Sequence, residues 1–172
     1  AKAVNYGLGY GQTDFGLARA LDVTQADARR YIERYFQRFS GVKEFMDRHL
    51  VEAKKTQMVY TILGRRLAVP ALTSRKFGER AAAERLARNA PVQGSAADIL
   101  KLAMLRIDEL IARTRSPAKM LLTVHDELVF EVPQTHAEQT AAFVREEMEN
   151  AYKLRVPLKV DVGIANNWAD AH

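Results

Sequence analysis

Two runs of apolar residues, Met120–Val124 and Leu128–Val132, flank the tripeptide His125–Glu127. Runs of this composition are typical of strands in a buried sheet, and the turn between two strands is normally small or neutral. Here the turn holds an imidazole and two carboxylates, Asp126 and Glu127. Such a cluster on rigid strands suits the binding of a divalent metal and of the substrate on which the metal acts. An ordinary hairpin is the alternative, because Asp is common in turns.

The composition limits the classes of protein that remain open. With 172 residues, 48% of them hydrophobic, the chain can bury the core of one globular domain or of two small ones. Its 26 Lys and Arg residues outnumber its 21 Asp and Glu residues, and the net charge of +5 modestly favours a polyanionic partner. Cysteine is absent, which excludes disulfides and thiolate metal sites and leads us to expect a cytoplasmic location.

Membrane association is not indicated. No apolar run approaches the roughly 18 residues that a membrane-spanning helix needs, and no signal peptide is recognisable, so we expect no membrane partner. The chain begins at Ala1 without a Met or a helix cap. We therefore expect it to be a piece of a longer protein.

The first ninety residues are expected to be helical apart from one hairpin. Hydrophobic periodicity and capping residues predict three helical segments: residues 2–20, a helix that Thr24 begins and Gly41 ends, and residues 42–55. Residues 58–70 are expected to form a short hairpin with the basic tip Gly64–Arg66.

The remaining residues predict one long helix and the strands of a sheet. The helix should run from about Glu79 to Arg113, with interruptions at Pro91 and Gly94. Its second half carries a stripe expected to be buried, namely Ala96, Leu100, Ala103, Ile107 and Leu110.

Another helix and a last strand are expected after the His125–Glu127 turn. Thr135–Glu138 has the pattern of a capping box for a helix ending near Tyr152. The alternation over Leu158–Ile164 predicts the final strand. Strands grouped with packing helices indicate the α+β fold class.

Lys2, Tyr6 and Tyr10 are spaced by four residues and form one stripe on a helix. The stripe is about 12 Å long, which is roughly the length of a nucleoside triphosphate. A Lys can hold the phosphates, one aromatic ring the sugar and another the base. The alternative is that both tyrosines belong to the core and that Lys2 is solvated.

A second stripe, again spaced by four, consists of Arg85, Asn89 and Gln93. Long polar amides on a helix next to a sheet can bind hydrogen-bond acceptors in a minor groove, and Arg85 can bind a phosphate. An exposed helix face without function is the alternative.

These segments together resemble the C-terminal part of family A DNA polymerases, the bacterial DNA polymerase I type. Lys2–Gly11 is similar to the nucleotide-binding fingers helix of that family, and Arg80–Asp98 resembles a stretch that comes later in the family's sequence. Val124–Leu128 resembles the catalytic motif of the palm. Asn167–Trp168 and Ala171–His172 resemble the end of such polymerases, so the resemblance covers essentially the whole chain in order.

The resemblance implies a fold, a reaction and its partners. Residues 1–90 would form a mostly helical fingers part, and residues 91–172 a palm part with an antiparallel sheet and packing helices. The reaction would be template-directed transfer of a deoxynucleoside monophosphate to a primer 3′-hydroxyl, in DNA replication or repair, with two Mg²⁺ ions. The partners would be primer-template DNA, dNTPs and the missing N-terminal part of the polymerase, with its thumb and the rest of its palm.

The resemblance also implies roles for single residues. In the palm turn, Asp126 would be a shared metal ligand, Glu127 would support it, and His125 would lie near the primer terminus. In the fingers, Lys2 would bind the triphosphate and act as general acid, Tyr6 would pack on the sugar, and Tyr10 would lie beside the templating base. Arg85, Asn89 and Gln93 would contact the primer-template near its growing end.

Some features of the family have no counterpart in the chain. The second metal-binding Asp and the Arg four residues before the Lys are absent, so we expect residues 1–172 to be inactive alone. Tyr6 stands where Phe is commoner. A non-catalytic, basic nucleic-acid-binding module of the same fold is the main alternative function. A metal nuclease using His125–Glu127 is another, but it explains neither the Lys2 stripe nor the Gln93 stripe.

Overall fold

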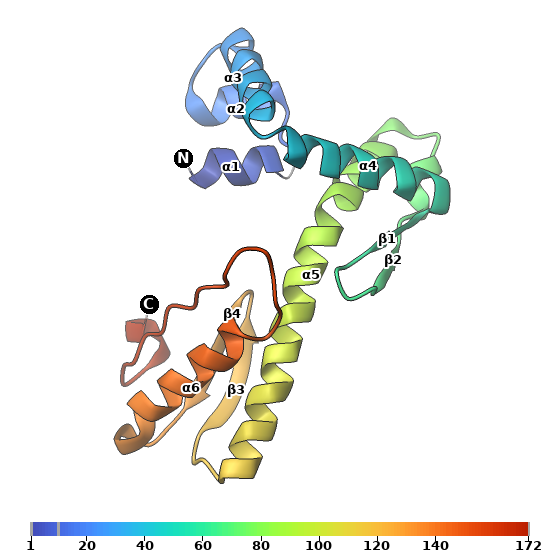
Figure 1. Ribbon diagram of the computed structural model, residues 1–172. Helices are drawn as coiled ribbons and strands as arrows, with labels where there is room; N and C mark the ends of the chain where they lie inside the picture. The colour runs from blue at the N-terminus through green and yellow to red at the C-terminus, as the bar shows by residue number, and fades with distance from the viewer. Residues whose placement is uncertain (1, 10, 172) are drawn as a thin grey trace. The chain divides into compact units, whose positions relative to one another are not determined.

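The computed structural model describes residues 2–9 and 11–171, with the backbone alone described for Lys2, Ala3 and Tyr6. Helices and two antiparallel hairpins make up this part of the chain (Figure 1), which confirms the predicted α+β class. The chain divides into two compact units, Ala1–Ser95 (unit 1) and Ala96–His172 (unit 2). The division lies close to the expected boundary near residue 90, while the assignment of fingers and palm stays a prediction.

Unit 1 is helical apart from one hairpin, as expected. Its elements are α1 (Lys2–Gly9), α2 (Asp14–Leu21), α3 (Gln25–Arg38), α4 (Ser40–Thr56), β1 (Met58–Tyr60), β2 (Arg66–Ala68), the 3₁₀ turn η1 (Pro70–Thr73) and the first part of α5 (Phe77–Thr114). One apolar cluster, which includes Leu8 and Leu17, joins α1, α2 and α3. A second cluster, which includes Leu50 and Val59, joins α4, the hairpin and α5.

Residues 2–20 form two helices rather than the single helix predicted. The chain turns at Gly11, whose φ of +80° is the left-handed conformation that glycine adopts without strain. The backbone N–H of Gln12 donates to the carbonyl of Gly7 over 2.8 Å, which closes α1. The side chain of Thr13 then caps α2 by accepting from the N–H of Gly16 at 3.2 Å.

The prediction that Gly41 ends a helix is also wrong. α3 begins after its predicted cap, Thr24, but ends at Arg38. α4 starts at Ser40, so Gly41 lies inside its first turn. A glycine ends a helix only when its backbone turns left-handed, and the left-handed glycines among the described residues are Gly11 and Gly64.

The long helix is continuous where two interruptions were predicted. α5 passes through Pro91 and Gly94 without a break. Proline removes one backbone donor, yet most helical stability in proteins comes from packing of an apolar face. Here Ala83 and Ala87 lie in the core of unit 1, and Ala90 packs against it.

Unit 2 consists of the rest of α5, a hairpin and one further helix. Its elements are β3 (Lys119–Val124), β4 (Glu127–Glu131), the 3₁₀ turn η2 (Gln134–His136), α6 (Ala137–Glu149) and the 3₁₀ turn η3 (Trp168–Ala171). Its core contains Ala103 and Ile107 of α5 and Val144 of α6, and Met120 and Phe130 pack against them from the hairpin. In the stripe of α5 that was predicted to be buried, Ala103 and Ile107 are buried, but Ala96 is exposed.

The apolar run of β3 is less buried than its composition indicated. Leu121 is 53% exposed and Leu122 is 42% exposed. The register between β3 and β4 shifts between Met120 and Leu122, which breaks the simple alternation of faces. In the described chain β3 pairs with β4 alone, so the outer edge of each of these strands is left without a strand partner.

Three further predictions in unit 2 are wrong. Thr135 makes no capping hydrogen bond to α6, because a 3₁₀ turn precedes the helix and the hydroxyl of Thr135 lies 3.0 Å from Nδ1 of His136. The helix ends at Glu149 rather than near Tyr152. Leu158–Ile164 forms no strand in the described chain, and the N–H of Val160 donates instead to the carboxylate of Glu149 at 3.0 Å.

No helix in the described ranges combines the length and the apolar composition that crossing a bilayer requires.

Candidate functional site

The His125–Glu127 segment forms the tight turn of the β3–β4 hairpin. Val124 pairs with Glu127 across the hairpin, so only His125 and Asp126 lie in the loop. His125 has a φ of +54°, and positive φ is what two-residue hairpin loops require. Histidine is one of the few residue types other than Gly that are enriched in this conformation. The local geometry thus presents the two polar side chains of the loop at the end of a short rigid ribbon.

The turn offers oxygen ligands but not a complete metal site. Asp126 and Glu127 are both exposed, and carboxylate oxygens are the ligands that hard cations such as Mg²⁺ prefer. No group of three or more His, Cys, Asp or Glu side chains suited to holding a metal ion occurs within residues 2–9 and 11–171. The chemistry of the two carboxylates therefore fits such an ion, while their number falls short of the six ligands that Mg²⁺ takes.

The second predicted stripe lies on the part of α5 that belongs to unit 1. Arg85 and Gln93 are exposed, whereas Asn89 is half-buried. The Oδ1 atom of Asn89 is buried and has no hydrogen-bond donor among the described residues. The stripe is thus not the fully solvated helix face of the alternative interpretation.

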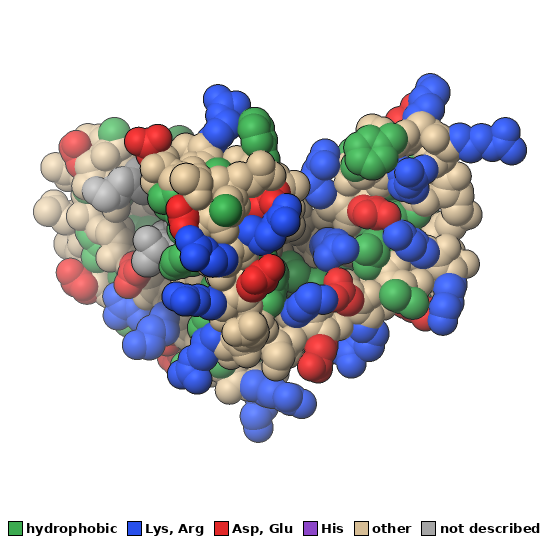
Figure 2. All heavy atoms as spheres, turned by 90° about the horizontal axis from the view of Figure 1, so that it is seen from above, with side chains coloured by type: hydrophobic (Ala, Val, Ile, Leu, Met, Phe, Trp, Pro, Cys, Tyr) green, Lys and Arg blue, Asp and Glu red, His purple; other side chains and the backbone are tan. Residues whose placement is uncertain are grey.

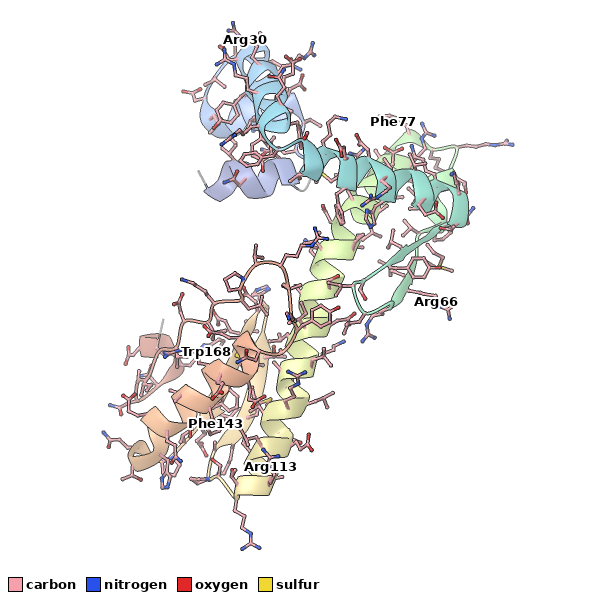
Figure 3. The ribbon with its side chains drawn as sticks, in the orientation of Figure 1. Arg30, Arg66, Phe77, Arg113, Phe143 and Trp168 are labelled. Carbon is pink, nitrogen blue, oxygen red and sulfur yellow. The ribbon has the colours of Figure 1, made fainter. Side chains whose placement is uncertain are left out.

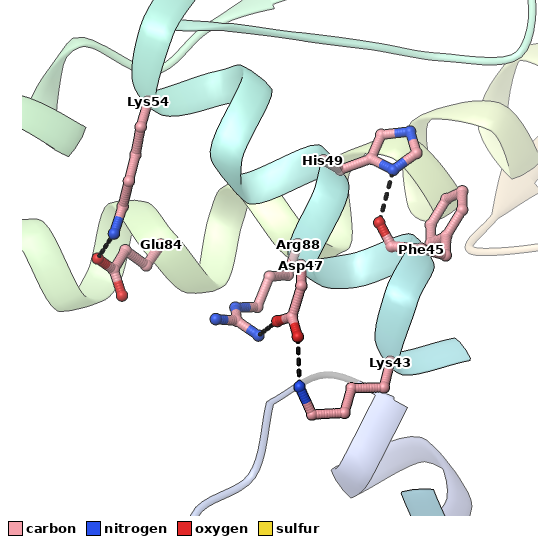
Figure 4. A network of polar contacts seen from close by, with 7 residues as sticks. All are labelled: Lys43, Phe45, Asp47, His49, Lys54, Glu84 and Arg88. Atoms are coloured by element: carbon pink, nitrogen blue, oxygen red, sulfur yellow. Dashed lines mark hydrogen bonds and ion pairs between the residues drawn. The ribbon is translucent and has the colours of Figure 1, made fainter. Parts of the chain in front are cut away.

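Ion pairs between α4 and α5 fix the helix on either side of Arg85 (Figure 4). Nζ of Lys54 lies 2.7 Å from Oε1 of Glu84, and the guanidinium of Arg88 lies 3.4 Å from Oδ1 of Asp47. The hydrogen bond from Lys54 is the main reason why the pKa of Glu84 lies below its ordinary value. These contacts hold Glu84 and Arg88 against α4, and Arg85 remains open to solvent.

The third predicted set lies largely outside the described residues. Lys2 and Tyr6 fall within α1, so their backbones are helical as predicted, but their side chains are not described. Tyr10 lies outside the described ranges altogether. The nucleotide-binding stripe therefore stays a prediction from the sequence.

Two structural features near these sets were missed by the sequence reasoning. The tip of the β1–β2 hairpin touches α5 at Gly94 and Ser95. Gly94 was a signal of this contact, because glycine is disfavoured inside a helix, but from the sequence we interpreted it as an interruption of the long helix. Asp98, on the next turn of α5, is 2% exposed, and no pattern in the sequence separates it from a solvated carboxylate.

On the face drawn in Figure 2, basic side chains are interspersed with acidic ones rather than gathered in one field. Figure 2 shows Lys and Arg side chains projecting over one face of the molecule among Asp and Glu side chains. This distribution agrees with a modest net charge of +5. A net charge of this size attracts a polyanion only modestly.

Comparison with known proteins gives a family match over almost the whole chain. The model of DNA polymerase family A matches residues 1–170. DNA polymerase I of Geobacillus stearothermophilus is 49% identical over 171 residues, which are 99% of this chain and 20% of that protein. DNA polymerase I of Lactococcus lactis subsp. cremoris is 47% identical over the same length and share. This chain thus spans about a fifth of the length of these curated relatives.

A solved structure agrees in fold as well as in sequence. The POL domain of Pol1 from M. smegmatis, in complex with DNA primer-template and dNTP, superposes with a TM-score of 0.93 at 45% identity. The match covers 99% of this chain and 30% of that one.

Proposed function

The chain belongs to DNA polymerase family A, and on that premise we propose that it is part of a DNA-directed DNA polymerase. The reaction is transfer of a deoxynucleoside monophosphate from a dNTP to a primer 3′-hydroxyl, directed by a template. The observation that carries the proposal is the agreement, over 99% of the chain, with a POL domain in complex with DNA primer-template and dNTP. These two ligands and the rest of the polymerase are the partners we assign.

The two units receive different roles under this proposal. Residues 1–90 serve as part of the fingers and bind the nucleotide through α1, where Lys2 holds the triphosphate and protonates the leaving group. Tyr6 packs on the sugar and Tyr10 beside the templating base. On α5, the exposed guanidinium of Arg85 binds a phosphate, and the amides of Asn89 and Gln93 contact base edges near the growing end of the primer.

Residues 91–172 serve as part of the palm. Asp126 and Glu127 would hold Mg²⁺, with further ligands from the rest of the polymerase, because the described residues provide no group of three suitable donors. When bound, two Mg²⁺ ions supply activation of the 3′-hydroxyl and neutralisation of charge on the pyrophosphate. The short loop of the β3–β4 hairpin fixes Asp126 by its backbone, and His125 lies beside the primer terminus.

Substitution of Asp126 tests the proposal. Asp126→Asn keeps the shape of the side chain and removes a charge that the metal needs, so the extension rate in a full-length polymerase containing this chain should fall on the order of a thousandfold or more. DNA affinity should change little, because phosphate contacts lie elsewhere. Asp108→Asn, an equal change of charge on an exposed part of α5, is the control and should leave the rate unaltered.

The same assay separates the alternative functions. A non-catalytic binding module would bind primer-template and extend nothing even with Asp126 in place. Near-normal extension by Asp126→Asn would mean that the turn is only structural and would contradict the assigned role.

A further inference from the structure

We propose that the β1–β2 hairpin is a separate contact with the phosphate backbone of duplex DNA, and that Arg66 is its phosphate-binding residue. The inference rests on the proposed function, which supplies a primer-template as the partner. Two observations support it. The first is the set of contacts that fix the tip of this hairpin to α5 within unit 1, and the second is the pair of side chains on the outer face of the hairpin.

The hairpin tip is fixed to α5 by two contacts at consecutive residues. The backbone N–H of Ile62 donates to Oγ of Ser95 over 2.8 Å. At Gly94 the approach is so close that an added Cβ would lie 2.7 Å from Cγ2 of Thr61. Glycine is disfavoured inside helices, so its presence in α5 is explained by this close approach.

The turn at the tip is ordered by its own hydrogen bonds. The N–H of Thr61 donates to the carbonyl of Arg65 at 3.0 Å, and the N–H of Gly64 donates to the carbonyl of Thr61 at 2.9 Å. Gly64 has a φ of +79°, which glycine adopts without strain. An exposed loop that only joined two short strands would not need to be anchored to a helix as well.

The outer face of the hairpin carries a cation next to an aromatic ring. Tyr60 and Arg66 are directly opposite each other in the register, so their side chains share one face, while the neighbouring Val59 is buried in the core. Figure 3 shows Arg66 on the side of the hairpin that faces away from α5. No carboxylate is paired with Arg66 in the parts of the chain that the structure describes.

This placement points to the DNA backbone as the partner. Gly94 and Ser95 follow Gln93 directly, so the anchor lies on the same turn of α5 as a residue assigned to the primer-template near its growing end. An arginine held on a rigid hairpin loses little freedom when it binds a phosphate, and its planar group forms two hydrogen bonds to the oxygens.

The test is the salt dependence of DNA binding by a full-length polymerase containing this chain, with a blunt DNA duplex as the probe. Each phosphate contact contributes about 0.9 to the slope of log K against log salt concentration. Arg66→Ala should therefore make this slope less steep by about 0.9. Arg66→Lys should keep the slope of the parent protein. Arg34→Ala, which removes an exposed arginine from α3 of the same unit, is the matched control and should leave the slope unchanged.

Variants at the anchor test whether the hairpin must be held in place. Gly94→Ala forces Thr61 away from α5, and Ser95→Ala removes the acceptor for Ile62. Both should weaken duplex binding, and the double variants with Arg66→Ala should bind no worse than Arg66→Ala alone, because each removes the same contact. Circular dichroism melting shows whether each variant is folded, and Ser95→Ala, with the smaller steric change, decides the question if Gly94→Ala does not fold.

Three results would overturn the inference. They are an unchanged slope for Arg66→Ala, an equal fall for Arg34→Ala, and a loss seen with single-stranded DNA only. In each case the parent protein still binds and extends a primer-template, so the proposed function stands. Failure of the parent protein to bind the duplex at all would instead reject the proposed function.

Discussion

Under the proposed function, Tyr6 determines whether nucleotides that lack the 3′-hydroxyl of the sugar are accepted. Under that proposal its ring packs on the incoming sugar where the 3′-carbon lies. With Phe, a nucleotide that lacks the 3′-hydroxyl leaves a gap in the polar contacts and is rejected. The phenolic hydroxyl of Tyr can fill this gap and supply the missing hydrogen bond. An unsatisfied buried partner costs about 1–3 kcal/mol, which corresponds to roughly ten- to over a hundredfold in selection.

We therefore expect a full-length polymerase with Tyr6 to use dideoxynucleotides almost as well as normal nucleotides. Tyr6→Phe should restore discrimination by that factor and hardly alter normal incorporation. The measurement is the ratio of kcat/KM for the two nucleotides in competition. Equal ratios for the two proteins would show that Tyr6 is a packing aromatic and would reject the role assigned to α1.

The helix caps provide a prediction at the scale of elements, because two similar sequence signals have different outcomes. Oγ1 of Thr24 accepts from the N–H of Asp27 at 3.1 Å and begins α3, whereas Thr135 makes no such bond to α6. Thr24→Ala should lower the free energy of unfolding by about 1 kcal/mol. Thr135→Ala should have almost no effect. Urea denaturation of both variants measures the difference, and equal losses would contradict the cap geometry of one of the helices.

The same comparison shows what the sequence could predict about the elements. The cap at Thr24, the β1–β2 hairpin and the turn at His125 depend on neighbours within a few residues, and all three were predicted. The continuity of α5 through Pro91 depends on packing against α4 and the hairpin, which lie tens of residues earlier in the chain. Leu158–Ile164 has the alternation of a strand, but a strand also needs a paired neighbour, and alternation alone does not supply one.

The residues of the candidate site differ in the same way: the place of some follows from neighbouring sequence, and the place of others follows only from the fold. Asp126 could be placed at the end of a hairpin from the sequence, because turn and strands are contiguous. The half-burial of Asn89 could not be predicted, since it results from how α5 packs within unit 1. Close approach at Gly94 was likewise hidden, because only the fold reveals that Thr61 is its neighbour.

At the scale of the whole molecule, acid should weaken unit 1. Four of its carboxyl groups have pKa values below their ordinary ones because they accept side-chain hydrogen bonds. The groups, each with the partner that contributes most, are Asp14 with Gln25, Asp27 with Thr24, Glu79 with Lys76, and Glu84 with Lys54. A group whose pKa is lowered by folding stabilises the fold above its unfolded pKa, and this contribution disappears as the pH falls through the folded pKa.

The ordinary values are 3.8 for Asp and 4.5 for Glu, so the loss should begin near pH 4.5 and continue below it. The midpoint temperature of thermal unfolding, measured between pH 7 and pH 3, should fall as the pH drops below 4.5. Glu84→Gln should make the midpoint less sensitive to pH, and Glu138→Gln on α6 is the control. A midpoint equally sensitive in the Glu84→Gln variant would show that the contact with Lys54 contributes nothing.

The last prediction concerns residues 1–172 by themselves. Two-metal catalysis needs two hard cations, each surrounded by about six oxygens, held within a few ångströms of each other. Asp126, in the loop, and Glu127, the first residue of β4, are adjacent and exposed, and no third suitable donor joins them in the described chain. We expect the purified chain to give no detectable primer extension with Mg²⁺ and all four dNTPs. A full-length polymerase containing the same residues, assayed in parallel, should extend the primer. Template-dependent extension by the chain alone would show that a complete metal site can form from these residues, and the proposed division of the active site would be wrong.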